Sequence, residues 1–238
     1  MKIKINRSAQ EQLQPILNRI ENRNIWYPLY NLEDQPVFKG RDREKEFYAD
    51  LDRYLDFNGK TVVDLGCNLG HYSFMAARLG AARVVGLDID ENLIQAAKIL
   101  RDHLGLNQVE FKRTDFLRAD VGDRYDVVLL IDYIGRNVIT KFKMKQVLLA
   151  AENYCRHEIL LTFHPDYTIQ HKLRTTPDRL ISFYTDQYIR NGKFQTLEYV
   201  SDYFKGKGHL AAHSPAQEWH ADNKMPVHFI RGVSDQDL

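Results

Sequence analysis

The sequence has 238 residues, with 33 Lys and Arg against 32 Asp and Glu, and is long enough to bury a full core. This balance creates no strong field that would point to nucleic acid or a membrane surface. Two cysteines, Cys67 and Cys155, exclude a disulfide framework and zinc or iron–sulfur sites made of four cysteines. We find no signal-peptide pattern and no run of 18 apolar residues, so we expect a cytoplasmic protein that does not bind a membrane.

Residues 1–57 are expected to form an N-terminal helical extension. Residues 8–23 place apolar side chains on one helical face, with Pro15 marking a kink or the first turn. The aromatic stretch 26–32 is expected either to cap a ligand cleft or to pack on the flank of the next domain. The charged stretch 39–57 has apolar residues at helical spacing and predicts a helix before the first main strand.

Residues 61–90 predict one strand–turn–helix–strand unit. The apolar runs 61–63 and 83–87 are typical of buried parallel strands, and residues 71–79 predict the helix between them. The turn holds Gly66 and Gly70, which allow close backbone approach to a ligand, and the helix N-terminus aims free N–H groups at it. Asp88 ends the second strand, where a carboxylate can accept both hydroxyl protons of a ribose. A nucleoside-type ligand is therefore expected.

The turn does not fit a dinucleotide. Asn68 and His71 stand where the G-x-G-x-x-G fingerprint needs glycine, and Asp64 would repel pyrophosphate but suit an ammonium or sulfonium group. The stretch D-L-G-C-N-L-G resembles motif I of the class I S-adenosylmethionine-dependent methyltransferases, D-x-G-x-x-x-G. V-G-L-D-I-D resembles the acidic segment after their second strand. The resemblance implies S-adenosyl-L-methionine as the cofactor.

Further along the chain, strands are predicted at residues 109–112, 126–131 and 158–163, and helices at 91–104, 138–154 and 196–205. Asp90 is expected to cap the helix 91–104, and Gly105 to end it. Residues 164–192 are longer than an ordinary connection and predict an insertion with a helix over 178–190. Residues 209–213 and 227–233 predict a closing hairpin.

The resemblance implies a Rossmann-like α/β/α methyltransferase fold for residues 58–233, with a seven-stranded, mostly parallel sheet and an antiparallel last strand. Residues 234–238 are left as a tail.

The same resemblance implies the cofactor-binding residues. Around the methionine part we expect Asp64, Gly66, Asn68 and Gly70, with Cys67 contributing backbone. Asp88 would hold the ribose hydroxyls, and Ile89 would line the adenine. Asp115 matches the family's acid that binds the adenine amino group, with Phe116 on the ring; alternatively Asp115 is a surface loop carboxylate. Ile131, at the end of the fourth strand, is expected to face the cofactor.

Candidate catalytic bases are Asp132, Tyr133 and His164, because they follow the ends of the fourth and fifth strands, where ligands bind in such sheets. A structural role for His164 is the alternative. The fourth strand ends I-D-Y-I-G, which differs from the N-P-P-Y or D-P-P-Y of enzymes acting on exocyclic amines of bases, and no nearby cysteine supports a covalent route. His209, His213, His220 and His228 could converge, but no carboxylate pattern completes a metal site, so no metal is expected.

The sequence therefore predicts a transferase that methylates oxygen or nitrogen of a small-molecule or sugar-like acceptor. Two alternatives stay open: an enzyme modifying tRNA or other RNA, and a non-catalytic module that binds the cofactor. A looser resemblance to the methyltransferase-like enzymes that modify the wobble uridine of tRNA supports the first alternative; the shared features are the N-terminal aromatic segment, the charged helix and V-V-D-L-G-C. No pattern indicates an oligomeric state.

Overall fold

The computed structural model describes residues 2–21, 24–40, 51–213 and 225–232. The chain forms two compact units. The first contains Met1–Asp120 and Tyr125–Leu129, and the second contains Val121–Arg124 and Leu130–Leu238. Among the helices in the described residues, none combines the length and apolar character needed to cross a membrane.

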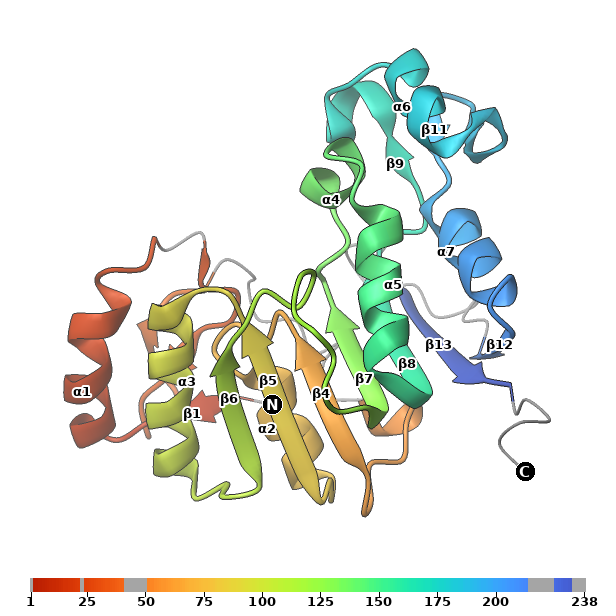
Figure 1. Ribbon diagram of the computed structural model, residues 1–238. Coiled ribbons are helices and arrows are strands. Elements are labelled where there is room, and N and C mark those ends of the chain that lie inside the picture. Colours follow the sequence, from red (N-terminus) through yellow and green to blue (C-terminus); the bar gives the residue numbers. More distant parts are fainter. Residues whose placement is uncertain (1, 22–23, 41–50, 214–224, 233–238) are drawn as a thin grey trace. The chain divides into compact units, whose positions relative to one another are not determined.

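The main sheet is built from strands that the sequence predicts. Their bounds are β4 Thr61–Leu65, β5 Arg83–Asp88, β6 Val109–Arg113, β7 Tyr125–Ile131, β8 Cys155–Phe163, β12 His209–His213 and β13 Met225–Arg231. Within the described residues these seven strands are hydrogen-bonded in the order β12-β13-β8-β7-β4-β5-β6 (Figure 1). The predicted seven-stranded sheet with an antiparallel last strand is confirmed, since β13 pairs antiparallel with both β8 and β12.

In the first unit, β4 pairs in parallel with both β5 and β7, and β5 pairs with β6. Helix α2 (His71–Arg78) packs on β4 and β5, and α3 (Glu91–Leu104) packs on β5 and β6. Both predicted caps of α3 are confirmed: the Asp90 carboxylate accepts the Asn92 N–H at 2.9 Å, and Gly105 adopts φ 67°. The Asp126 carboxylate accepts the Thr61 N–H and hydroxyl at 2.8 and 2.7 Å, which joins the starts of β7 and β4.

The N-terminal part of this unit is only partly helical. It contains α1 (Arg7–Leu17) and a small sheet of β1 (Ile3–Lys4), β2 (Leu29–Tyr30) and β3 (Pro36–Phe38). Pro15 lies inside α1 rather than in its first turn. Residues 41–50 of the predicted helix 39–57 lie outside the described residues, whereas Leu51, Leu55 and Phe57 are buried.

In the second unit the predicted helix 138–154 is interrupted. It consists of α4 (Arg136–Thr140) and α5 (Met144–Tyr154), because Phe142 between them has φ 59°, which an α-helix cannot contain. Helix α7 (Thr196–Lys205) has its predicted bounds. The turn and tail predicted around residues 221–226 and 234–238 fall mostly outside the described residues.

The insertion is more structured than the sequence indicates. The predicted helix 178–190 is shorter, α6 (Pro177–Tyr184), because Thr185 turns to φ 64°. The rest of the insertion consists of β9 (Tyr167–Thr168), the π-helix η3 (Ile169–Leu173), the 3₁₀ turn η4 (Asp186–Tyr188), β10 (Ile189–Arg190) and β11 (Lys193–Phe194). Its three short strands form a separate sheet in the order β10-β11-β9.

Candidate functional site

The turn between β4 and α2 has the geometry expected of a ligand-binding loop. Gly66, Asn68 and Gly70 have φ of 77°, 53° and 83°, in the left-handed region that glycine and asparagine tolerate best. The N–H groups of Gly66 and Cys67 donate to the Leu87 carbonyl at 2.8 and 2.9 Å, which fixes the turn against the end of β5. A Cβ at position 70 would lie 2.4 Å from the Phe111 ring, so glycine is required there.

Asp88 ends β5 directly beside this turn. One carboxylate oxygen accepts the Asn68 N–H at 3.0 Å, and the other accepts the Asp90 N–H at 3.0 Å. Burial raises the pKa of Asp88, and the two N–H donors oppose this shift. Each oxygen keeps a further lone pair that can accept a hydroxyl proton. The next residue, Ile89, is 62% exposed.

Asp64 lies beneath the turn and is only 2% exposed. Its carboxylate accepts the Ser73 hydroxyl of α2 at 2.7 Å, and burial raises its pKa to about 7. Burial also raises the pKa of the neighbouring Cys67 thiol well above its ordinary value, which suits the expected backbone role of Cys67 better than nucleophilic chemistry. The contact between Ser73 and Asp64 was not predicted. The one feature of the sequence that could have indicated it is the serine hydroxyl three residues after Gly70.

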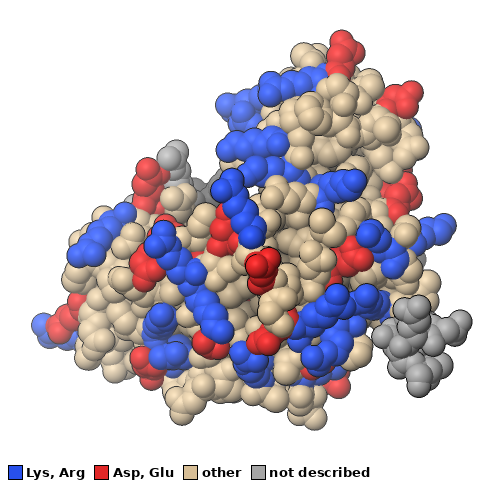
Figure 2. Space-filling model, in the orientation of Figure 1, with Lys and Arg blue, Asp and Glu red and all other residues tan. Residues whose placement is uncertain are grey.

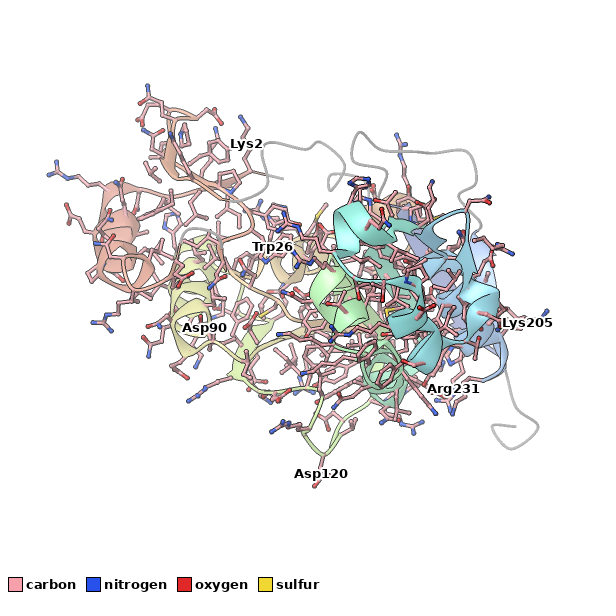
Figure 3. All side chains as sticks on the ribbon, turned by 90° about the horizontal axis from the view of Figure 1, so that it is seen from above. Lys2, Trp26, Asp90, Asp120, Lys205 and Arg231 are labelled. Atoms are coloured by element: carbon pink, nitrogen blue, oxygen red, sulfur yellow. The ribbon has the colours of Figure 1, made fainter. Side chains whose placement is uncertain are left out.

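The aromatic segment after α1 packs against the same turn. The Asn68 amide accepts the Trp26 N–H at 3.2 Å and donates to the Asn24 carbonyl at 2.7 Å (Figure 3 labels Trp26). The Tyr27 ring stacks on the His71 ring at 4.4 Å, and the hydroxyls of Tyr27 and Tyr72 lie 2.7 Å apart. Burial lowers the pKa of His71 to about 3, so this ring is neutral. The segment 24–27 is therefore attached to the predicted cofactor loop.

Asp115 and Phe116 follow β6 on the same unit. The Thr114 N–H donates to the Asp88 carbonyl at 2.8 Å, which ties this loop to the end of β5. The Asp115 carboxylate accepts the Leu117 N–H at 3.2 Å and lies 3.6 Å from Arg118 Nε, while Phe116 is buried. Both readings of Asp115, adenine ligand and surface carboxylate, are compatible with these contacts.

The predicted catalytic residues belong to the second unit. Ile131 is buried and Tyr133 is half-buried. Asp132 has φ 56°, and Thr162 of β8 holds it twice: the Thr162 hydroxyl accepts the Asp132 N–H at 2.8 Å and donates to its carboxylate at 2.9 Å. His164 meets the Tyr167 ring edge-on at 5.2 Å. Thr162 was not predicted, because only strand register brings it beside Asp132.

The histidines of the closing hairpin have other contacts. His228 Nε2 lies 2.8 Å from a carboxylate oxygen of Glu158, and His209 is buried against the Phe204 ring at 5.3 Å. The side chains of His213 and His220 lie outside the described residues. Within the part of the chain that the structure describes, no three His, Cys, Asp or Glu side chains are grouped so as to hold a metal ion.

Comparison with known families agrees with the fold and the turn. A family model described as "Methyltransferase domain" matches residues 56–231, which is most of the chain. The chain belongs to the methyltransferase domain family. This match and the solved structures confirm the predicted class I methyltransferase family and its cofactor, S-adenosyl-L-methionine. The residues that hold the cofactor remain predictions.

Individual relatives match only part of their own length. Ribosomal protein L11 methyltransferase of Salmonella arizonae is 43% identical over 77 residues, which covers 32% of this chain and 25% of that protein. The enzyme of Alteromonas mediterranea is 35% identical over 107 residues, covering 45% of this chain and 34% of that protein. The chain thus spans about a third or less of the curated relatives it matches.

Solved structures share the fold of this domain over most of the chain. The magnesium protoporphyrin IX methyltransferase of Synechocystis, solved with S-adenosylhomocysteine bound, has a TM-score of 0.55 at 21% identity and covers 78% of this chain and 80% of its own. Ribosomal protein L11 methylase of Lactobacillus delbrueckii has a TM-score of 0.54 at 15% identity, covering 84% and 90%. Both confirm the Rossmann-like fold.

The first unit also fits this cofactor by its own chemistry. Asp88 offers two fixed carboxylate oxygens with lone pairs for a ribose diol. Ile89 beside it exposes apolar area that a purine ring would cover. The left-handed turn brings bare backbone to the same strand ends.

Proposed function

We propose that this chain transfers the methyl group of S-adenosyl-L-methionine to an oxygen or nitrogen of its acceptor. The observation that carries the proposal is the Asp88 carboxylate, fixed by the N–H groups of Asn68 and Asp90 beside the left-handed turn. When bound, the cofactor supplies a methyl group on a positively charged sulfur. The role of the first unit is to hold and orient it.

Asp132 is the residue we propose for the acceptor proton. A general base matters when the acceptor must lose its proton as the new bond to the methyl carbon forms, and such a base typically contributes about 10²–10⁴-fold. Asp132 follows β7 directly, and Thr162 holds its left-handed backbone and one carboxylate oxygen in place.

The acceptor class is a finer part of the proposal. The small-molecule or sugar-like acceptor expected from the sequence stays a prediction. Two kinds of similar protein are named for their acceptors, a ribosomal protein and a porphyrin. The match to the ribosomal protein methyltransferases covers only a quarter to a third of their length, and the porphyrin methyltransferase shares only the fold with this chain. RNA is a second candidate, because the second unit carries an exposed aromatic and basic surface.

Transfer of radiolabel tests the function and the acceptor class together. The protein is incubated with methyl-labelled cofactor and a cell extract, which is then fractionated into RNA, protein, lipid and small molecules. We expect label in one fraction with the unmodified protein and with Asp120→Ala, an exposed loop variant, and loss of label with Asp88→Ala (Figure 3 labels Asp120). Label in no fraction, despite tight cofactor binding, would favour a non-catalytic module.

A further inference from the structure

The break in the predicted helix 138–154 puts an aromatic ring at the surface. Phe142 adopts φ 59°, a conformation that bulky residues rarely take, and its ring stacks face-to-face on Phe183 of α6 at 3.5 Å and 10°. Phe183 remains 61% exposed. The Phe142 N–H donates to the Ile139 carbonyl at 3.1 Å and the Lys143 N–H donates to the Val138 carbonyl at 2.9 Å, so Phe142 is the left-handed residue of the cap that ends α4.

Positive charge surrounds the two rings. The Arg179 guanidinium lies 5.6 Å from the centre of the Phe142 ring, Lys141 is the preceding residue, and η3 and the position after it contribute Lys172 and Arg174. Figure 2 shows Lys and Arg side chains gathered over this part of the second unit. In residues 136–143 and 169–184 there are six Lys and Arg against one acid, Asp178.

These residues sit on elements that contact one another. Arg136 Nε of α4 donates to the Leu173 carbonyl of η3 at 3.1 Å, and the Tyr184 hydroxyl of α6 donates to the Ile139 carbonyl of α4 at 2.8 Å. We define the aromatic-basic face by its members Lys141, Phe142, Lys172, Arg174, Arg179 and Phe183.

The cations of this face lack the partners that others have. In the described part of the chain, no carboxylate forms an ion pair with Lys141, Lys172 or Arg174. Nearby on the same unit, Lys193 pairs with Asp166 at 3.1 Å, and Arg190 pairs with Glu198. Positive charge beside an exposed aromatic stack is complementary to an anionic partner that also has flat rings.

We propose that the aromatic-basic face binds a single-stranded nucleic acid. An unpaired base would extend the Phe142–Phe183 stack, while Lys141, Lys172 and Arg174 would contact backbone phosphates. A duplex offers no free base face for stacking, and an acidic peptide without aromatic side chains would not stack on the two rings. The binding step is independent of the proposed function; only the further statement that the bound strand carries the methyl acceptor rests on it.

Fluorescence anisotropy with a labelled, mixed-sequence 16-nucleotide RNA tests the proposal, with the same sequence as single-stranded DNA and as a duplex in parallel arms. We expect a Kd of about 1–100 μM at 0.1 M salt, rising steeply with salt. Phe183→Ala should weaken binding roughly 10-fold at an unchanged salt slope, and Phe183→Trp should restore it. Lys172→Glu with Arg174→Glu should lower the slope by about 1.4. Tighter binding of RNA than of DNA would identify RNA as the natural ligand.

Matched controls lie on exposed positions elsewhere. Leu210→Ala removes an exposed apolar side chain from β12, and Lys98→Glu reverses a charge on α3; neither should change binding. Circular dichroism of each variant checks folding. Equal binding by all variants, equal binding of the duplex, or binding of polyglutamate that ignores Phe183→Ala would overturn the proposal. The last outcome would assign the face to an acidic protein.

The two proposals fail separately. Asp88→Ala should bind RNA like the unmodified protein, because Asp88 belongs to the other unit. Intact RNA binding without methyl transfer to any acceptor would contradict the proposed function alone. Methyl transfer without nucleic-acid binding would contradict the aromatic-basic face alone.

Discussion

The two units differ in the residues they place at left-handed backbone positions. In the described residues of the first unit, such positions hold glycine, Asn68 or Asp34, which adopt this conformation at little cost. The described residues of the second unit place glycine at two such positions, Gly192 and Gly208, and other residues at five: Asp132, Phe142, Arg174, Thr185 and Asn191. Three of these five, Phe142, Arg174 and Thr185, are residues for which the conformation costs roughly 1–2 kcal/mol. The first unit thus confines left-handed backbone to residues that tolerate it, whereas the second unit also places bulkier side chains there.

Removing the carboxylate of Asp132 should have the largest effect. Asp132→Asn keeps the size and the Thr162 contacts of the side chain but cannot take a proton, so we expect kcat to fall about 10²–10⁴-fold with an unchanged KM for the cofactor. Steady-state kinetics with the acceptor fraction identified by radiolabelling measures this. Asp120→Asn is the matched control, and unaltered kcat in Asp132→Asn would remove Asp132 as the base.

Asp88→Ala should give the next largest effect, in the first unit. Loss of two hydrogen bonds to the ribose, each contributing at least about 1.5 kcal/mol, should weaken S-adenosylhomocysteine binding about 100-fold. Isothermal titration calorimetry measures the affinity, and thermal unfolding verifies that the variant folds. Unchanged affinity in a folded variant would contradict the assignment of the cofactor loop.

Asp64 predicts a pH dependence of stability. Its pKa is about 7 in the folded chain against an ordinary 3.8, so between pH 5.5 and 7 the folded state holds a proton that the unfolded state has lost. The free energy of unfolding should therefore fall as pH rises, by roughly 1–2 kcal/mol over this range, with the slope flattening as pH nears 7.

Asp64→Asn isolates this effect in denaturant titrations at pH 5.5, 6.25 and 7. The variant keeps a neutral acceptor for Ser73 and should lack this contribution to the slope, while other groups such as His71 contribute equally to both proteins. Parallel pH profiles for the two proteins would show that Asp64 is ionised in the fold throughout this range.

The smallest effects should come from two substitutions at left-handed positions, one that removes a glycine and one that introduces a glycine. Gly105 ends α3 at φ 67°, and Arg174 ends η3 at φ 54°. Gly105→Ala should lower the free energy of unfolding by about 1 kcal/mol, and Arg174→Gly should raise it by a similar amount while weakening nucleic-acid binding. Denaturant titration and anisotropy measure the pair. If Arg174→Gly destabilises the fold, the backbone at Arg174 is not strained, and the idea that this strain is kept for binding is wrong.

Local patterns account for the parts of the fold that could be predicted. The turn 66–70, the end of β5 and the caps of α3 all lie within 40 consecutive residues, and glycines and short polar side chains form each of them. The interrupted helix at Phe142 could not be predicted, because its left-handed cap is made by backbone bonds to Ile139 and Val138 and phenylalanine is not a residue that marks such a cap. Ser73 and Thr162 were missed for a similar reason, since their partners are set by packing and strand register.

The dual attachment of Asn68 has a thermodynamic consequence. Its backbone N–H contacts the carboxylate of Asp88, and its side chain holds the segment at Asn24 and Trp26. Linkage is reciprocal, so if a nucleoside ligand on Asp88 steadies Asn68, an ordered segment 24–27 must tighten that ligand by the same factor. In that case, variants of the segment 24–27 should change how tightly the proposed cofactor is retained, through Asn68 rather than through Asp88 itself.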